Sequence, residues 1–121
     1  MRDFLYVFIG GGVGSMMRYL VGKCLSTSAS GFPWSTFTVN VVGCFLIGLL
    51  TAWIARQSLS ADIRLLLVVG FCGGFTTFST FSNEALALMR SGETVLFALY
   101  LAGSIVAGLL AVWAGSFLVR G

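Results

Sequence analysis

Four long apolar runs, separated by short polar segments, constrain this chain more than any other feature of its sequence. A helix needs about 20 mostly apolar residues to cross the hydrocarbon core of a bilayer. Only 9% of the residues are charged, against roughly 25% in a soluble domain. The sequence therefore predicts an all-α membrane protein with four transmembrane helices, in one domain over residues 1–121. The four runs cover about residues 4–25, 34–55, 63–89 and 94–119.

The same composition argues against several classes of function. Histidine is absent, which removes the commonest metal ligand and proton shuttle. Cys24, Cys44 and Cys72 stand singly in or beside apolar runs, without disulfide or zinc spacing, so they are predicted to be small packing residues. No nucleophile–base pair or phosphate-binding loop is present, and we expect no enzyme. The net charge of +3 forms no basic patch, so we expect no nucleic-acid partner.

The ends and glycines of the runs predict how the helices are arranged. The first run is predicted to be a helix of the bundle and not a cleaved signal peptide, because cleavage would leave three spans. Short loops, including the polar loop at residues 26–31, force neighbouring helices to be antiparallel and place both termini on one side. Glycines four apart, at 10 and 14 and at 70 and 74, favour close helix packing. Aromatic residues with polar tips near the run ends are typical of an interfacial belt: Tyr6, Tyr19, Trp34, Trp53, Tyr100 and Trp113.

Basic residues are distributed almost evenly between the two sides of the predicted bundle. The side with the termini carries Arg2, Arg56, Arg64 and Arg120. The opposite side carries Lys23 and Arg90, with Arg18 added if its side chain extends outward. Orientation follows from a clear excess of Lys and Arg on one side. The weak excess here permits either a single orientation or insertion in both orientations, followed by antiparallel pairing with a second copy.

The strongest local signal lies in the third run, where two adjacent glycines precede five hydroxyl residues interleaved with three phenylalanines, over residues 73–82. Adjacent glycines and β-branched threonines are poor helix formers, so a break is predicted near the middle of the membrane. Backbone groups freed by a break cannot face lipid and must line a cavity or a protein interface. Broken helices of this kind commonly hold ions. The alternative is an interface between helices held by Ser and Thr hydroxyls.

If the helix resumes after the break, its residues sort into two neighbouring rows. Phe78 and Phe81 are three apart and share a face, and Thr77, Thr80 and Glu84 form a polar row beside them. Aromatic ring edges carry the positive part of the ring quadrupole, and hydroxyls donate hydrogen bonds. An anion path between the two rows is therefore physically reasonable, and it requires no fixed cation.

Other polar residues inside the runs are weaker candidates when each is taken alone. Asn40 lies within the second run, and its amide is either interhelical glue or a neutral donor for an anion. Tyr100 and Ser104 add hydroxyls to the fourth run. Arg18 and Glu84 are the charges expected to lie deepest, where charged groups are usually paired or functional.

Three motifs together resemble the Fluc (CrcB) family of fluoride channels, and the resemblance covers essentially the whole chain. The third motif is highly specific, and the first two are moderately so. The motifs are Gly11-xx-Gly14-xxx-Arg18-Tyr19, Thr38-Val39-Asn40 and Gly73-Gly74-Phe75-Thr76-Thr77-Phe78-Ser79-Thr80-Phe81.

The resemblance implies an antiparallel, dual-topology homodimer in the lipid of the bacterial inner membrane, with two pores. Such a dimer would export fluoride passively and selectively and so relieve its toxicity. By the same resemblance, Arg18 would lie near a vestibule, and the main-chain carbonyls of Gly73 and Thr76 would hold a structural sodium ion. The implied pore residues are Asn40, Thr77, Phe78, Ser79, Thr80, Phe81, Glu84, Tyr100 and Ser104.

Two other functions fit a chain of this architecture. A small multidrug-resistance-type antiporter is also a four-helix dimer, but it exchanges protons for cations at a carboxylate deep in the first helix. The first run here has no acid beyond Asp3 at its start. An accessory subunit without transport of its own would use the polar third helix as an interface. Spacing alone also does not separate fluoride from another small anion, and that step depends on the resemblance.

Overall fold

A computed structural model describes residues 1–25 and 31–120, and every regular element in these ranges is a helix. Four stretches are long and apolar enough to cross a membrane, the third being the composite span Ala61–Arg90. The prediction of four transmembrane helices is therefore confirmed. The elements are α1 (Arg2–Cys24), α2 (Trp34–Gln57), α3 (Ala61–Arg64), η1 (Leu65–Cys72), α4 (Gly73–Phe75), α5 (Phe78–Arg90) and α6 (Thr94–Arg120).

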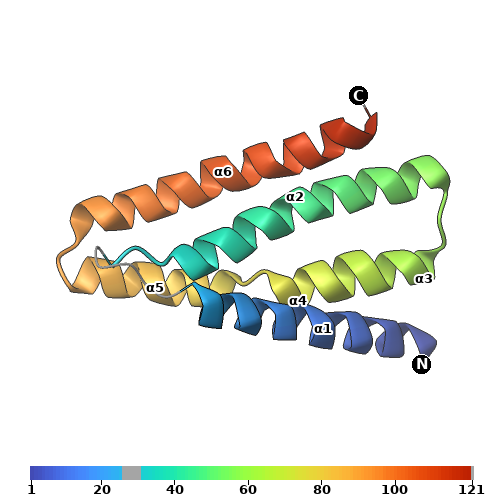
Figure 1. Ribbon diagram of the computed structural model, residues 1–121, viewed down its shortest axis with the longest axis horizontal. Helices are drawn as coiled ribbons and strands as arrows, with labels where there is room; N and C mark the ends of the chain where they lie inside the picture. Colours follow the sequence, from blue (N-terminus) through green and yellow to red (C-terminus); the bar gives the residue numbers. More distant parts are fainter. Residues whose placement is uncertain (26–30, 121) are drawn as a thin grey trace.

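The four spans begin and end within two residues of the predicted runs, and the third span is interrupted by the break before α5. Neighbouring spans are antiparallel, so α1 begins and α6 ends at the same end of the molecule, as predicted (Figure 1). Most of the predicted loop at residues 26–31 lies outside the described residues. At the other end, Ser60 caps α3 by accepting a hydrogen bond from the amide of Ile63 at 3.4 Å.

Glycines bring α1 into backbone contact with the first half of the third span. A Cβ placed on Gly14 would lie 2.9 Å from the amide nitrogen of Phe75. A Cβ on Gly10 would lie 2.9 Å from the amide nitrogen of Phe71, and one on Gly74 would meet the backbone of Gly11. The close packing predicted from glycines four residues apart is therefore confirmed, because two helices approach this closely only where neither carries a side chain.

A second close contact joins α2 to α6, which lie side by side along most of their length (Figure 1). Gly48 packs against the backbone of Val112, and a Cβ on Gly108 would lie 3.4 Å from the sulfur of Cys44. The prediction that the cysteines are small packing residues holds for buried Cys72 and half-buried Cys44, but it is wrong for Cys24, which is exposed at the end of α1.

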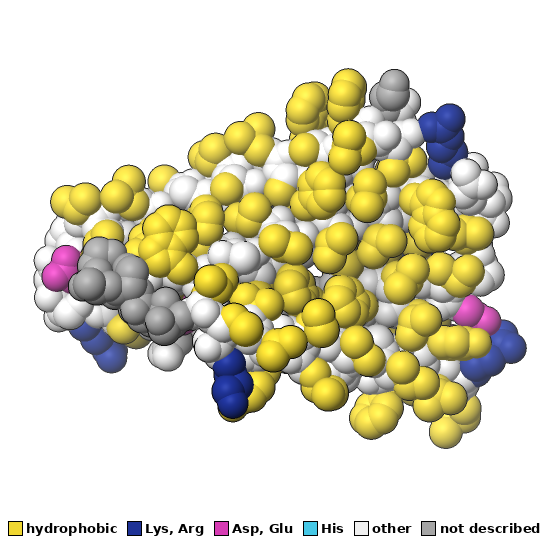
Figure 2. All heavy atoms as spheres, in the orientation of Figure 1, with side chains coloured by type: hydrophobic (Ala, Val, Ile, Leu, Met, Phe, Trp, Pro, Cys, Tyr) yellow, Lys and Arg dark blue, Asp and Glu magenta, His cyan; other side chains and the backbone are white. Residues whose placement is uncertain are grey.

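A small aromatic core lies between α5 and α6, and apolar side chains cover the exposed face seen in Figure 2. The core contains Phe81, Ala85, Leu88 and Tyr100. Tyr100 is 0% exposed, so its assignment to an interfacial belt is wrong. Most of the charged side chains visible in Figure 2 lie toward the two ends of the long axis, as expected for a protein whose middle faces lipid.

The third span is broken, as predicted, and the break falls at its middle. Thr76 and Thr77 are extended, with ψ angles of 160° and 119°, and α5 begins at the next residue. Of the glycines and threonines that predicted the break, the two glycines stay helical in α4, and the helix ends at the β-branched pair Thr76 and Thr77. The first half also contains wide π-helical turns over η1, a distortion that the sequence did not predict and that is frequent at functional sites.

Candidate functional site

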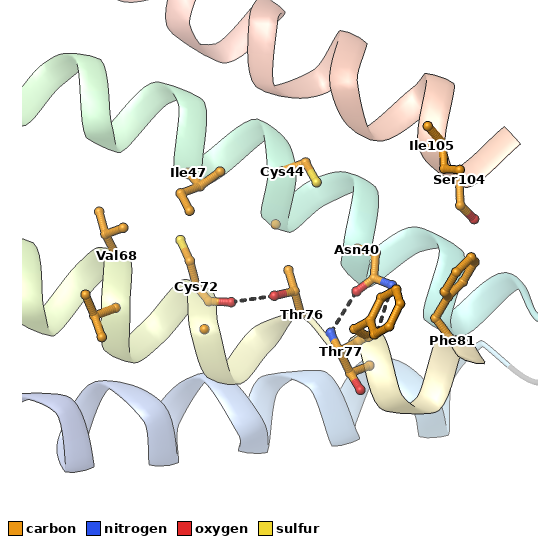
Figure 3. Close-up of a pocket in the computed structure, with 14 residues that line it drawn as sticks. Asn40, Cys44, Ile47, Val68, Cys72, Thr76, Thr77, Phe81, Ser104 and Ile105 are labelled. Atoms are coloured by element: carbon orange, nitrogen blue, oxygen red, sulfur yellow. Dashed lines mark hydrogen bonds between the residues drawn. The ribbon is translucent and has the colours of Figure 1, made fainter. Parts of the chain in front are cut away.

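The side chain of Asn40 on α2 holds the break in the third span. The amide of Thr77 donates to the Asn40 side-chain oxygen at 2.8 Å, and the Asn40 amide donates to the Thr77 carbonyl at 3.1 Å (Figure 3). The asparagine therefore satisfies the Thr77 amide, which has no helical partner, and adds a second donor to the Thr77 carbonyl at the start of α5. A primary amide carries two N–H groups, so one donor of Asn40 is left for another acceptor.

Hydroxyl groups gather at the start of α5. The Thr77 hydroxyl accepts from the amide of Thr80 at 3.1 Å, as a helix cap, and lies 3.1 Å from the Thr80 hydroxyl and 3.2 Å from that of Ser79. The first amides of a helix carry partial positive charge along its axis. The three hydroxyls and the beginning of a helix of 13 residues therefore form a neutral environment that favours negative charge.

Two side chains of α1 donate hydrogen bonds to a carbonyl at the end of the first half of the third span. The carbonyl of Gly74 accepts from Arg18 Nε at 3.0 Å and faces the Ser15 hydroxyl at 3.5 Å. The family resemblance implied that Arg18 lies near a vestibule. In the structure its guanidinium neutralises the carbonyl end of a half-helix, and Arg18 is not among the residues that line the hollow described below. Ser15 was missed, because a single serine inside an apolar run carries no distinctive signal.

The break also removes the usual donors from the carbonyls of Gly73 and Thr76. In an uninterrupted α-helix these carbonyls accept from the amides four residues later, at Thr77 and Thr80. Here the Thr77 amide donates to Asn40, and the Thr80 amide donates to a side-chain hydroxyl. A Cβ on Gly73 would meet nothing within 4 Å, so this part of the backbone is openly approachable.

A hollow of about 550 Å³ lies against the break, between α2, the third span and α6 (Figure 3). The hydroxyl of Ser104 is buried and has no hydrogen-bond partner among the described residues, although it lines this hollow. The rings of Phe78 and Phe81 lie 5.9 Å apart, with Phe78 79% exposed and Phe81 buried. The hollow brings together seven predicted residues: Asn40, Gly73, Thr76, Thr77, Phe78, Phe81 and Ser104.

Glu84 and Tyr100 form a separate pair farther along α5. The Tyr100 hydroxyl donates to Glu84 Oε1 at 2.9 Å, so the carboxylate is held against α6 and not beside the hydroxyls at the start of α5. The predicted polar row is therefore confirmed for Thr77 and Thr80, whereas Glu84 turns to a different partner. Thr36, on the first turn of α2, is buried and was missed, because hydroxyl residues are ordinary at a helix start.

The hollow offers hydrogen-bond donors without a fixed charge. Within the described residues, its lining contains amide and hydroxyl donors, aromatic rings and aliphatic side chains, but no charged side chain. A site that conducts an ion must bind it well enough to admit it and weakly enough to release it. Neutral donors next to ring edges meet both conditions for a small anion.

Known proteins resemble this chain over almost its full length. Residues 5–116 match the family described as CrcB-like protein, Camphor Resistance (CrcB). The "Fluoride-specific ion channel FluC" of Bacteroides fragilis is 49% identical over 122 residues, which cover 98% of this chain and 96% of that protein. The protein of the same name from Phocaeicola vulgatus is 48% identical over 116 residues, covering 95% and 96%. This chain is therefore a multi-pass membrane protein that belongs to the CrcB family.

Proposed function

We propose that this chain forms a fluoride-selective channel through which fluoride leaves the cell passively. The relatives named above are described as fluoride-specific ion channels. The observation that carries the proposal is the set of unused neutral donors at the break. Asn40 keeps one N–H for a further acceptor, and the buried hydroxyl of Ser104, a residue that lines the hollow, has no partner among the described residues. An unsatisfied buried hydroxyl is costly unless a ligand accepts from it.

The arrangement suits an anion that must exchange its hydration shell for protein donors. Fluoride entering the hollow would accept from Asn40 and Ser104, then pass the edges of Phe78 and Phe81. The threonine hydroxyls at the start of α5 would be the next donors on the path, and the pair of Glu84 and Tyr100 lies beyond them. Up to that pair, each step replaces one neutral donor by the next, so the ion keeps a partner and is not trapped beside a fixed cation.

The proposed channel is an antiparallel homodimer with two pores. Phe78 is 79% exposed, and Gly73 and Ser79 are also exposed, next to irregular backbone at the middle of the third span. Irregular backbone is not tolerated against lipid, so protein must cover this surface. A second copy in the opposite orientation is the partner that the weak asymmetry of Lys and Arg permits. Each copy would then contribute one donor-lined path.

A sodium ion on the axis of this dimer belongs to the same proposal. The carbonyls of Gly73 and Thr76 have lost their helical donors and lie where the chain is open to approach. Carbonyl oxygens suit a hard cation, and two from each copy would supply four ligands. No cluster of three His, Cys, Asp or Glu side chains that could hold a metal is present in the part of the chain that the structure describes. When bound, the ion would supply positive charge that joins the two breaks.

The alternative of a proton-coupled antiporter is not favoured. Such a transporter needs an available carboxylate deep in the membrane. Glu84 is the one acid well inside a span, and it already accepts the Tyr100 hydroxyl. The first helix has only Asp3, in its first turn. The relatives also carry a channel name.

Fluoride efflux from liposomes tests the proposal directly. The purified protein is reconstituted with a potassium ionophore to remove the electrical limit, and fluoride release is compared with chloride release. We expect fast fluoride release with little chloride release, and loss of fluoride release in Asn40→Ala. Gly12→Ala is the matched control, because a Cβ there meets nothing within 4 Å. A folded protein that releases no fluoride would refute the proposal and favour an accessory subunit.

A further inference from the structure

A second hollow of about 770 Å³ lies between the C-terminal halves of α2 and α6. Ile47 lines both this hollow and the one at the break, so the two share a wall. Two arginines, two hydroxyl residues and small apolar residues form the remainder of the wall. The lining residues are Ile47, Gly48, Thr51, Ala52, Ala55, Arg56, Val112, Ser116 and Arg120.

The residues that line the two hollows follow one face of α2. The steps there are of three or four residues, through positions 40, 44, 47, 51 and 55, and residues at these spacings lie on the same side of a helix. On α6, Ser104 and Ile105 line the hollow at the break, and Val112, Ser116 and Arg120 line the second one. The two hollows therefore succeed one another along α2 and meet at Ile47.

The second hollow is electropositive. Arg56 and Arg120 are exposed and lie at the C-terminal ends of their helices, where the helix dipole alone would repel an anion. Among the described residues, no acidic side chain lines the hollow, and the one ion pair joins Arg2 to Asp62. Arg56 also donates to the Val119 carbonyl, which fixes the guanidinium at the hollow while several of its five N–H groups stay available.

We propose that this second hollow is the anion-attracting mouth of the pathway, and that Arg56 and Arg120 concentrate fluoride there before it reaches Asn40. The inference rests on the proposed channel function and assigns a role to residues outside the donor-lined hollow. Charges that line a concave surface raise the local concentration of an oppositely charged ion and its rate of entry. The effect extends about 8–10 Å at physiological ionic strength and is screened by added salt.

The test is the salt dependence of fluoride flux in Arg56→Gln, Arg120→Gln and the double variant. At about 10 mM salt, where the Debye length is about 30 Å, we expect the double variant to conduct roughly 3- to 10-fold more slowly than the unsubstituted protein. At about 1 M salt, the difference should fall below about twofold, because the Debye length is then only about 3 Å. The control is Arg64→Gln, an exposed arginine at the same end that does not line the hollow, and its flux should stay unchanged.

A second variant separates charge from obstruction. Ser116→Cys places a thiol in the hollow, and reaction with a sulfonate-bearing or an ammonium-bearing thiol reagent adds opposite charges of similar size. We expect the sulfonate adduct to slow fluoride flux at low salt. The flux through the ammonium adduct should be faster than the flux through the sulfonate adduct. The unsubstituted protein treated with the same reagents controls for its own cysteines.

The outcomes separate this inference from the proposed function. Loss of flux in the unsubstituted protein would overturn both. Normal flux of the unsubstituted protein, with no salt-dependent difference between the double variant and Arg64→Gln, would overturn the role of the second hollow and leave the channel function standing. Equal slowing by both adducts would have the same meaning. The same guanidinium pair could bind a lipid phosphate, so fluxes are repeated in vesicles of phosphatidylcholine only. A difference that appears only when phosphatidylglycerol is added would assign the arginines to lipid and overturn the inference.

Discussion

The close contact between α1 and the third span makes a sharp prediction for Gly14→Ala. A Cβ at this position would lie 2.9 Å from the amide nitrogen of Phe75 and closer still to the carbonyl oxygen of Phe71. Both neighbours are backbone atoms, so no flexible side chain can move aside. The two helices must separate, and overpacking of this kind costs about 1–3 kcal/mol.

Gly12→Ala is the matched control for this change. A Cβ on Gly12 meets nothing within 4 Å, and both variants gain the same helix propensity of about 1 kcal/mol over glycine. The difference between the two variants therefore isolates the steric cost. It corresponds to a factor of about 5 to 160 in the ratio of folded to unfolded protein.

The assay is the midpoint of unfolding in a titration with sodium dodecyl sulfate, together with fluoride flux from liposomes. We expect Gly14→Ala to unfold at a clearly lower detergent fraction than Gly12→Ala. Its flux should also fall, because separating the helices lengthens the 3.0 Å bond from Arg18 to the Gly74 carbonyl. Equal midpoints would refute the reasoning, since they would mean that α1 does not pack against the third span at Gly14.

Substitutions at four positions test the residues at and beside the break. In Asn40→Ala the partly buried amide of Thr77 loses its partner, at about 1–3 kcal/mol, and the Thr77 carbonyl loses one of its donors. We therefore expect a lower unfolding midpoint and at least tenfold slower fluoride flux; wild-type values for both would contradict this. Phe78→Ile should slow fluoride flux without lowering the unfolding midpoint of a single copy, because the Phe78 ring is 79% exposed. Phe81→Ile should lower both the flux and the unfolding midpoint, because the Phe81 ring is only 9% exposed. Equal unfolding midpoints for the two variants would contradict this difference in burial. In Arg18→Gln a charge-assisted bond worth about 1.5–3 kcal/mol is lost, and Arg18→Lys should recover part of the unfolding midpoint if charge at the half-helix end matters.

Much of the fold could be predicted from the sequence because lipid imposes simple rules. A span must be apolar over about 20 residues and must satisfy its own backbone, so the four runs predict four helices almost to the residue. Glycines at a spacing of four predict close packing, and Gly10 and Gly14 indeed contact the third span. The run of glycines, threonines and phenylalanines predicts a break, because few of its members favour a helix.

The position and support of the break needed the tertiary structure. Propensity suggested the glycines and the threonines together, but Gly73 and Gly74 stay helical while Thr76 and Thr77 are extended. The reason is that Asn40, on another helix, offers an acceptor and a donor to the backbone of Thr77. Such a pairing between residues 37 apart in sequence has no local signal.

The sequence by itself determined the solvent, the number of spans and the residue types able to handle an anion, since these follow from composition and from spacing along one helix. Only the tertiary structure decided which polar groups keep a free donor. Glu84 is held by Tyr100 and Arg18 by a carbonyl, while the Ser104 hydroxyl is left unpaired in the hollow. The physical reason is that a side chain's chemistry is local, whereas its hydrogen-bond partner is set by the packing of helices that are distant in sequence.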